Sequence, residues 1–385
     1  MIISILDYWK RCDSMAELQQ LSSIIYGCDI SQHNIDVSDL STDSEKQAYI
    51  KTVIKNSVDN GFYSLPNAVV GGETINGCVA SEKPISFILL RAGHGNSKDA
   101  IFEYAYNAIV ELNNDSYNIG IGAWWFATNG KVSYFNTYKS EYGDPQITKF
   151  KEALHGKKFD YPIYLDFENE GYGGTLTSNI ASCSYASDVP QYWIEKLEED
   201  GWYAGVYTSA SVFAEKLDDN SYVRSKPIWI AGYYSDGENS DPAVHYGSWF
   251  NNPYPWQITQ YWGNDVSNTQ NNRLYYVDRD KCNVDYPSYI KAIGKNGYTA
   301  TDTSNPDPDP EPTPIEPLNI PRKKLKLYIA HSTPAVTTLK DKTPLSIDRL
   351  EYDGTEWNGS LTKKETTDDD DTSSSDPSSQ TGGGD

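Results

Sequence analysis

Short apolar runs alternate with longer amphipathic stretches over most of the chain, from about Ile24 to Gly297. The apolar runs, rich in β-branched and aromatic residues, are IIYGCDI, ISFILLRA, IGIGAWWFA, YPIYLDF, WYAGVYT, PIWIAGY, PWQITQY and LYYVD. Strands that alternate with helices are typical of βα units on a parallel sheet, and eight such strands can close into a barrel. The pattern therefore predicts an α/β fold, an irregular TIM-like (β/α) barrel.

The stretches between these runs predict helices, several of which open on Ser or Asp and close on Gly or Asn, as capping favours. They are DSEKQAYIKTVIKNSVDNG, SKDAIFEYAYNAIVELNN, DPQITKFKEALHG, DVPQYWIEKLEEDG and SASVFAEKLDD. Three connections are longer than a minimal barrel needs: 61–84, 169–187 and 235–254. The last two follow carboxyl ends of predicted strands, where barrels place their active-site loops, so we expect them to wall a substrate groove; the first follows a helix.

An abrupt change of composition after Ala300 marks a domain boundary. The sequence TDTSNPDPDPEPTPIEP alternates Pro with acidic residues, which favours a stiff, extended linker. Beyond it, short alternating segments with DG and NG turns indicate a small C-terminal β segment, and the final residues lack the apolar content that folding requires. We expect a helical N-terminal extension (1–24), the barrel (25–298), a Pro/acid-rich linker (299–318), a small β module (319–362) and a disordered acidic Ser/Gly tail (363–385).

Charge and cysteine content exclude several classes of function. The chain carries 32 basic and 54 acidic residues, a formal charge of −22, which argues against the basic surface that nucleic-acid binding requires. Its five cysteines are an odd number without CxxC spacing, so neither a disulfide framework nor a zinc site is expected. The 30 Tyr and 10 Trp offer flat apolar faces with polar edges, which suit sugar rings.

Four acidic residues fall at the ends of predicted strands. Asp166 and Glu168, in YPIYLDFENE, are two residues apart and should project to the same side, about 7 Å apart. Two carboxylates in one cavity repel, which raises the pKa of at least one and leaves a proton available near neutral pH. Asp29 closes the first run and Asp278 the last, and the first and last strands of a closed barrel are neighbours. We therefore expect one acidic pocket, suited to glycoside hydrolysis.

The span from Tyr26 to about Tyr286 resembles the family 25 glycoside hydrolases, the Chalaropsis-type lysozymes, which are N-acetylmuramidases. The matching stretches occur in family order: GCDIS, FILLRAGHG, GAWWFA, YPIYLDFE, GVYTS, PIWIAGY, PWQITQYW and YYVDRD. The resemblance implies cleavage of the β-1,4 bond between N-acetylmuramic acid and N-acetylglucosamine in bacterial peptidoglycan. No cofactor is implied.

The resemblance also implies residue roles. Glu168 would be the general acid, and Asp166 would orient the substrate acetamido group or stabilise the charged intermediate. Asp29 and Asp278 would complete the acidic floor, and whether the intermediate is covalent or formed by the substrate's own acetamido oxygen stays open. Positions that match groove residues of the family are Tyr207, Trp229, Tyr233, Trp256 and Gln257, and Arg91 would pair either with the acids or in a structural ion pair.

Two departures from the family pattern affect these assignments. The family's third strand commonly reads Ala-Tyr-His-Phe, whereas this chain has Ala123, Trp124, Trp125 and Phe126, so a polar wall becomes apolar. Trp124 is then a candidate substrate contact. Asp280 lies close to Asp278, and Asp278 is preferred as the last acid because it follows a valine as the family pattern requires.

Two other functions are compatible with the sequence. The acids could hold a divalent metal in a barrel hydrolase acting on phosphate or acetyl esters, although none of the five histidines has metal-binding spacing with them. Alternatively, the domain could bind glycan without catalysis or be a structural virion protein. A binding protein gains nothing from holding two repelling carboxylates together, which favours the enzyme.

The first residues, MIISILDYWKRCDSMAELQQLSS, lack the apolar core and cleavage site of a signal peptide, and no later run has the length of a membrane span. With the linker and the C-terminal module, this predicts a bacteriophage lysin made in the host cytoplasm. It would act at the cell wall as a free endolysin or a virion tail component. Its expected partners are bacterial peptidoglycan and, in the virion, other phage tail proteins, with no nucleic acid and no membrane.

Overall fold

The computed structural model describes residues 17–70, 72–128, 134–168, 184–241, 256–264, 268–300, 345–352 and 357–363. The chain divides into two compact units, Met1–Asp309 and Pro310–Asp385, which are treated separately below.

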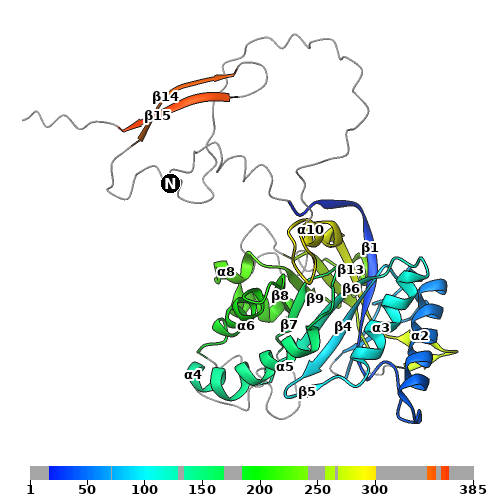
Figure 1. The fold of residues 1–385 in the computed structure, drawn as a ribbon. Coiled ribbons are helices and arrows are strands. Elements are labelled where there is room, and N and C mark those ends of the chain that lie inside the picture. Colours follow the sequence, from blue (N-terminus) through cyan, green and yellow to red (C-terminus); the bar gives the residue numbers. More distant parts are fainter. Residues whose placement is uncertain are drawn as a thin grey trace, which may run out of the picture. The chain divides into compact units, whose positions relative to one another are not determined.

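Eight strands in the described part of the first unit close into a barrel (Figure 1). In chain order they are β1 (Gln20–Ile30), β4 (Phe87–His94), β6 (Gly120–Phe126), β7 (Ile163–Asp166), β8 (Ala204–Ser209), β9 (Ile228–Ala231), β10 (Ile258–Trp262) and β13 (Asp278–Val284). They are ordered β1-β13-β10-β9-β8-β7-β6-β4, and a parallel pairing of β1 with β4 closes the ring. The short β5 (Ser97–Lys98) pairs with the end of β4. The predicted α/β barrel is confirmed.

The prediction of the eighth strand was wrong. The run LYYVD corresponds to β12 (Arg273–Tyr276), which forms a separate hairpin with β11 (Asn268–Gln270). Asn271 and Asn272 between them both have a φ of 53°, the left-handed backbone that a two-residue hairpin turn requires. The barrel is closed instead by β13, antiparallel to both β1 and β10. Its sequence, DRDKCNV, does not read as an apolar run because its first two inward positions carry the acids Asp278 and Asp280.

Helices pack around the outside of the barrel (Figure 1). The longer ones are α2 (Asp43–Asn60), α3 (Phe102–Asn114), α5 (Asp144–Leu154) and α6 (Asp188–Glu198), close to their predicted positions. The shorter ones are α4 (Phe135–Tyr138), α7 (Ala210–Val212), α8 (Ser221–Arg224), α10 (Tyr286–Ala292), the π-helical turns η1 (Lys139–Gly143) and η3 (Phe213–Leu217), and the 3₁₀ turn η4 (Gly237–Asn239). Thr42 and Glu45 form a reciprocal capping box at the start of α2. No helix among the described residues is long and apolar enough to span a bilayer.

The predicted N-terminal helix over residues 1–24 is wrong in its last part. Residues from Gln20 onward belong to β1, where Gln20 pairs with Val284 of β13. This long-range pairing overrides the local amphipathic pattern. Residues 1–16 lie outside the described part of the chain.

Residues 61–84, here called the insertion lobe, cover the outer face of β10 and β13. The lobe contains the hairpin β2 (Ala68–Val70) and β3 (Glu73–Ile75), and its Leu65, Ala68, Cys78 and Ala80 pack against Tyr261 and Trp262 of β10. It follows a helix, as expected from the sequence. However, the Val69 N–H donates to the Gly263 carbonyl at 3.0 Å, so the lobe also reaches the carboxyl end of β10.

The second unit contains an antiparallel hairpin of β14 (Leu345–Tyr352) and β15 (Trp357–Lys363), in which Leu345 pairs with Lys363 and Tyr352 with Trp357. This hairpin falls within the segment for which the sequence predicts a β module, apart from its last residue. The predicted linker beyond Ala300 and the predicted tail beyond Lys363 lie outside the described residues.

Candidate active site

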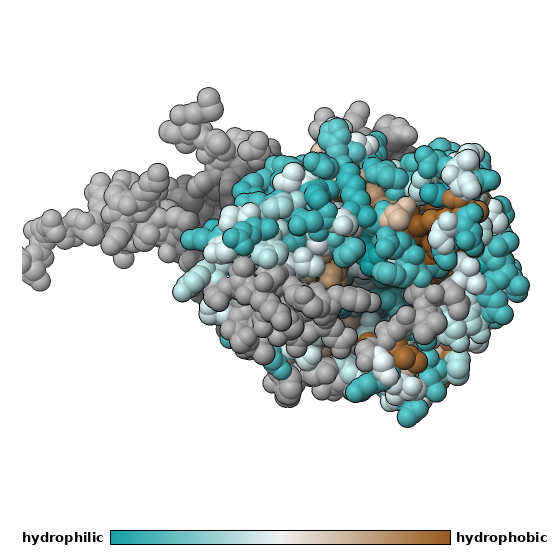
Figure 2. Space-filling view, turned by 90° about the horizontal axis from the view of Figure 1, so that it is seen from below, coloured by the Kyte–Doolittle hydropathy of each residue, from teal (hydrophilic) through white to brown (hydrophobic). Residues whose placement is uncertain are grey.

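The four predicted acids lie at one end of the barrel. Asp166 is the last residue of β7 and Glu168 follows two residues later, while Asp29 lies near the carboxyl end of β1. Asp278 begins β13 and is the direct cross-strand partner of Asp29. The two are neighbours because β13 runs antiparallel, so its first residue meets the carboxyl ends of the other strands. Figure 2, seen from below Figure 1, looks onto this end of the barrel, whose visible surface is largely hydrophilic.

Strand alternation points these carboxyl groups into the barrel. Cys28 and Leu165, their chain neighbours, are buried in the core cluster that lies between the barrel and the helices. The side chains of Asp29 and Asp166 face the other way, and these residues are only 6% and 4% exposed. The acids are therefore held in a protein interior rather than in bulk water.

Asp29 is fixed by a hydrogen bond from the strand beyond β13. Gln260 Nε2 donates to Asp29 Oδ2 at 2.6 Å. Burial raises the pKa of Asp29 well above its usual value, the nearby Asp278 and Asp280 raise it further, and the Gln260 bond opposes them. Asn264 N–H donates to Asp278 Oδ1 at 3.0 Å, which orients the partner acid.

Asp166 is buried with one oxygen, Oδ1, that has no hydrogen-bond partner among the described residues. Burial raises its pKa well above the usual value, Glu168 and Asp29 add to this by charge repulsion, and Arg91 lowers it. Glu168 itself is half-buried. The pair thus combines one strongly desolvated carboxyl group with a second that is more accessible.

Arg91 forms a structural ion pair rather than a direct bond to the four acids. Its Nε donates to Asp99 Oδ2 at 2.8 Å, and the guanidinium lies 5.7 Å from the centre of the Trp124 ring. Arg91 Nη2 and Trp124 Nε1 are both buried without a hydrogen-bond partner within the described structure. Since Arg91 and Trp124 are cross-strand partners, two unused donors lie on neighbouring strands beside Asp166.

Tyr207 and Tyr233 connect the aromatic side chains to the acids. The Tyr207 hydroxyl donates to Gln260 Oε1 at 2.7 Å and lies 3.4 Å from the Tyr233 hydroxyl. Burial raises the pKa of Tyr233, and the nearby Asp278 raises it further. Both tyrosines therefore lie at the acidic end, as the sequence predicts.

Trp229 lies beneath the acids rather than on an open wall. It is 1% exposed, and its ring centre lies 4.2 Å from that of Tyr207 and 6.3 Å from that of Trp124. The expected apolar groove wall is likewise only partly realised. Trp124 faces the barrel interior, but Trp125 faces outward, packs on Phe150 and is fully buried.

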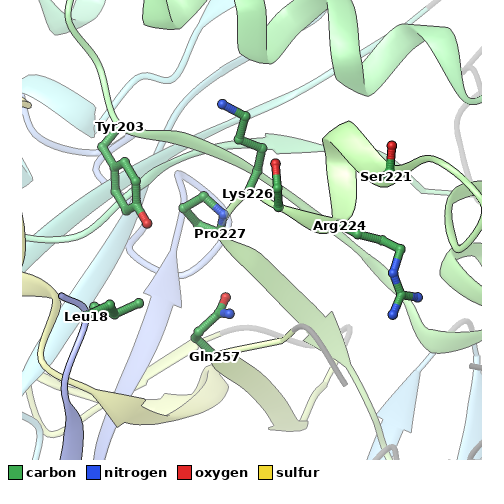
Figure 3. Close-up of a pocket in the computed structure, with 8 residues that line it drawn as sticks. Leu18, Tyr203, Ser221, Arg224, Lys226, Pro227 and Gln257 are labelled. Atoms are coloured by element: carbon green, nitrogen blue, oxygen red, sulfur yellow. The ribbon is translucent and has the colours of Figure 1, made fainter. Parts of the chain in front are cut away.

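Trp256 and Gln257 are not brought to the acids. They precede β10, at the amino ends of the parallel strands; Gln257 Oε1 accepts from the Ile228 N–H at 3.0 Å and from the Tyr286 hydroxyl at 3.2 Å. Figure 3 shows Gln257 at a cavity of about 430 Å³ at this end. The cavity is lined by Leu18, Tyr203, Ser221, Arg224, Ser225, Lys226, Pro227 and Gln257 and contains none of the four acids. The expectation that these two residues line the groove is therefore wrong. They precede β10, whereas the acids lie at the carboxyl ends of the strands.

Comparison with known proteins agrees with the geometry of the acidic end. Residues 78–266 match the family described as glycosyl hydrolases family 25. The barrel is similar to the family 25 glycoside hydrolases over this segment, which spans β4 to β10, and it is called the family 25 domain below. The matched segment contains Asp166 and Glu168; Asp29 and Asp278 lie outside it, on the two strands that close the barrel.

Solved structures similar to the family 25 domain include three from diverse sources. They are the catalytic domain of endolysin ply40 from bacteriophage P40 of Listeria monocytogenes (14% identity, TM-score 0.42, 70% of this chain and 98% of that chain), a muramidase from Acremonium alcalophilum (19%, 0.40, 70% and 98%) and the lysozyme of Streptomyces coelicolor (20%, 0.37, 68% and 94%). No curated protein matches the chain significantly.

Two further residues of the family 25 domain belong to the site. Gln260, which the sequence did not indicate, bridges Tyr207 and Asp29, and Asp280, considered only as the alternative to Asp278, accepts a hydrogen bond from Trp229 Nε1 at 2.8 Å. The sequence could have indicated Gln260 by its place near the carboxyl end of a predicted strand, three residues after Gln257, which the family motif had suggested. Asp280 shares the inward face of β13 with Asp278, so both candidates for the last acid point into the barrel.

Within the described residues, no group of three or more His, Cys, Asp or Glu side chains is arranged to hold a metal ion. Cys28, Cys78 and Cys282 are free, buried thiols. The groups that the described site presents are carboxyl groups, hydroxyls and indoles.

Proposed function

We propose that the family 25 domain hydrolyses the β-1,4 bond between N-acetylmuramic acid and N-acetylglucosamine in bacterial peptidoglycan. The observation that carries the proposal is the convergence of Asp29, Asp166, Glu168 and Asp278 at the carboxyl end of the barrel strands. Glycoside hydrolysis needs one group to protonate the departing oxygen and a second to stabilise the positive charge on the sugar. The family match and the collinear motifs support the choice of bond.

Glu168 is proposed as the general acid, because it is the more accessible of the pair and lies beyond the strand end where a glycosidic oxygen can approach. Asp166 is proposed to act in its ionised form, orienting the acetamido group or stabilising the charged intermediate. The nearby positive charge of Arg91 lowers the pKa of Asp166 and so favours that form against the effect of burial. Asp29 and Asp278 complete the acidic floor.

The unused donors of Arg91 and Trp124 and the hydroxyls of Tyr207 and Tyr233 are proposed to position the sugar. A pyranose presents hydroxyls at its rim and C–H groups on its faces, so indole and phenol groups can satisfy both. Trp229 is proposed to support Tyr207 and Trp124 from below rather than to contact the substrate.

Clearing of a peptidoglycan suspension tests the proposal. The wild type should reduce turbidity, Glu168→Gln should be inactive, and the exposed matched control Glu141→Gln should match the wild type. Equal clearing by Glu168→Gln would refute the role of Glu168, and no clearing by the folded wild type would favour a non-catalytic glycan-binding or structural role. Activity that survives a strong chelator would remove the metal-dependent alternative.

We also propose that the chain serves as a phage lysin, either a free endolysin or a tail component that contacts other tail proteins. The combination of a wall-cutting domain with a second unit beyond a Pro/acid-rich segment supports this setting. Mass spectrometry of purified virions distinguishes the two forms: a tail component is present at a fixed copy number, and an endolysin is absent.

A further inference from the structure

A fifth acid, Asp280, lies one strand repeat below Asp278 and faces the same interior. It has no exposed surface, and its cross-strand partner on β1 is Gly27, two residues before Asp29 on the same face, so the Asp29 and Asp280 side chains are diagonal neighbours. Asp280 Oδ1 accepts from Trp229 Nε1, whereas Oδ2 has no donor among the described residues. Asp29 accepts from Gln260 on its Oδ2.

The surroundings of this pair hold few charges. The titratable and polar groups that face it from the neighbouring strands are Asp278, Asp166, Glu168, Tyr207, Tyr233, Cys282, Gln260 and Trp229. Arg279, between Asp278 and Asp280 in the chain, lies on the opposite face of β13, where it donates to the carbonyls of Tyr63 and Ser81. No cation among these groups offsets two negative charges on neighbouring buried side chains, so both carboxyl groups cannot be ionised together without a large cost.

We propose that Asp29 and Asp280 share a single proton and act as one monoanionic unit, in which Asp280 is a positioning residue for Asp29. The proton supplies the donor that Asp280 Oδ2 otherwise lacks. The bond from Trp229 to Asp280 and the bond from Gln260 to Asp29 hold the two carboxyl groups on either side of the shared proton. The shared proton is independent of what the domain hydrolyses; only its effect on catalysis rests on the proposed function.

Burial raises the pKa of both Asp29 and Asp280, which fits this arrangement. In the unfolded chain both groups ionise near the usual value of about 4. The folded protein retains one proton above that value, so its stability declines as the pH rises, until the folded pair loses the proton. Asp280→Asn keeps an acceptor for Trp229, supplies a fixed N–H donor to Asp29 and removes one titrating group.

Thermal unfolding measured against pH tests the shared proton without any substrate. Between about pH 4 and pH 8, the Tm of Asp280→Asn relative to the wild type should rise by about 3 °C or more. Asp39→Asn, at an exposed position, is the matched control and should show no such trend. A constant Tm difference between Asp280→Asn and the wild type over this range would overturn the proposal.

Infrared spectroscopy provides a second measurement should Asp280→Asn not fold. The carboxylic C=O band of a protonated acid should persist at neutral pH in Asp166→Asn protein, which lacks the Asp166 carboxyl group whose pKa burial also raises, and the absence of the band would overturn the proposal. For the catalytic effect, Asp280→Ala should lower kcat/KM by about tenfold or more, and Asp280→Asn should restore most of it. Equal loss in both variants would show that an ionised Asp280 is needed and would refute the positioning role.

Discussion

Replacing Gln260 with leucine should damage both the stability of the barrel and the pH dependence of its activity. Gln260 is 2% exposed and bridges two strands, donating to Asp29 and accepting from Tyr207. The bond to the acidic pair contributes about 1.5 to 3 kcal/mol and the neutral bond from Tyr207 about 1 kcal/mol. The apolar area of leucine recovers part of this, so we expect a net loss of about 2 to 3 kcal/mol in the free energy of unfolding.

The activity change follows from the pKa of Asp29. The Gln260 bond lowers that pKa, so its removal raises the pKa further and shifts the acid limb of kcat/KM to higher pH. Both quantities are accessible: urea unfolding gives the stability, and turbidity rates at a series of pH values give the acid limb.

Gln257→Leu is the matched control on the same segment of chain. Its side chain also accepts hydrogen bonds, from the Ile228 N–H and the Tyr286 hydroxyl, but at the opposite end of the barrel. It should lose comparable stability, about 2 kcal/mol, while the acid limb stays in place. The reasoning is refuted if Gln260→Leu leaves the acid limb unmoved, or if Gln257→Leu moves it equally.

Three further predictions concern other parts of the site and its support. The pKa of Asp166 is raised and its ionised form is proposed to be active, so kcat/KM should fall on the acid side at a pH above about 4, the usual aspartate pKa. A fall in kcat/KM only at or below about pH 4 would contradict the role of Asp166. Gly263→Ala would place a Cβ 2.9 Å from Tyr233 and 3.2 Å from Asp278 Oδ1 and so displace these groups. We expect kcat/KM, measured at equal concentrations of folded protein, to fall about tenfold or more. Unchanged kinetics would show that neither group needs its present position. Arg279→Ala removes a fully buried guanidinium that donates to two carbonyls of the insertion lobe. Urea unfolding should show that the free energy of unfolding falls by about 3 kcal/mol or more. A smaller loss would mean that the lobe does not depend on these bonds.

The parallel part of the fold could be predicted because its strands are buried on both faces and read as continuous apolar runs. The closing strand could not, because Asp278 and Asp280 occupy two of its inward positions and the outward Arg279 is buried under the insertion lobe. A hydrophobic pattern assigns such a segment to the surface. Asp29 and Asp278 were nevertheless placed together correctly, since a closed barrel makes its first and last strands neighbours whichever way the last one runs.

The acids of the site were predictable from their position at strand ends, but their supports were not. Gln260 and Gln257 are three residues apart, and only the start of β10 decides which of them reaches the acids. The bond from Trp229 to Asp280 and the contact of Val69 with Gly263 join residues far apart in the sequence, and no local pattern encodes such pairs. Motif spacing identifies reacting groups more readily than the hydrogen bonds that hold them.

Mass analysis of the fragments released from purified peptidoglycan tests the central claim most directly. Hydrolysis at the proposed bond yields fragments whose new reducing ends are N-acetylmuramic acid, produced by the wild type and absent with Glu168→Gln. New reducing ends on N-acetylglucosamine, or freed peptides in place of glycan fragments, would contradict the account.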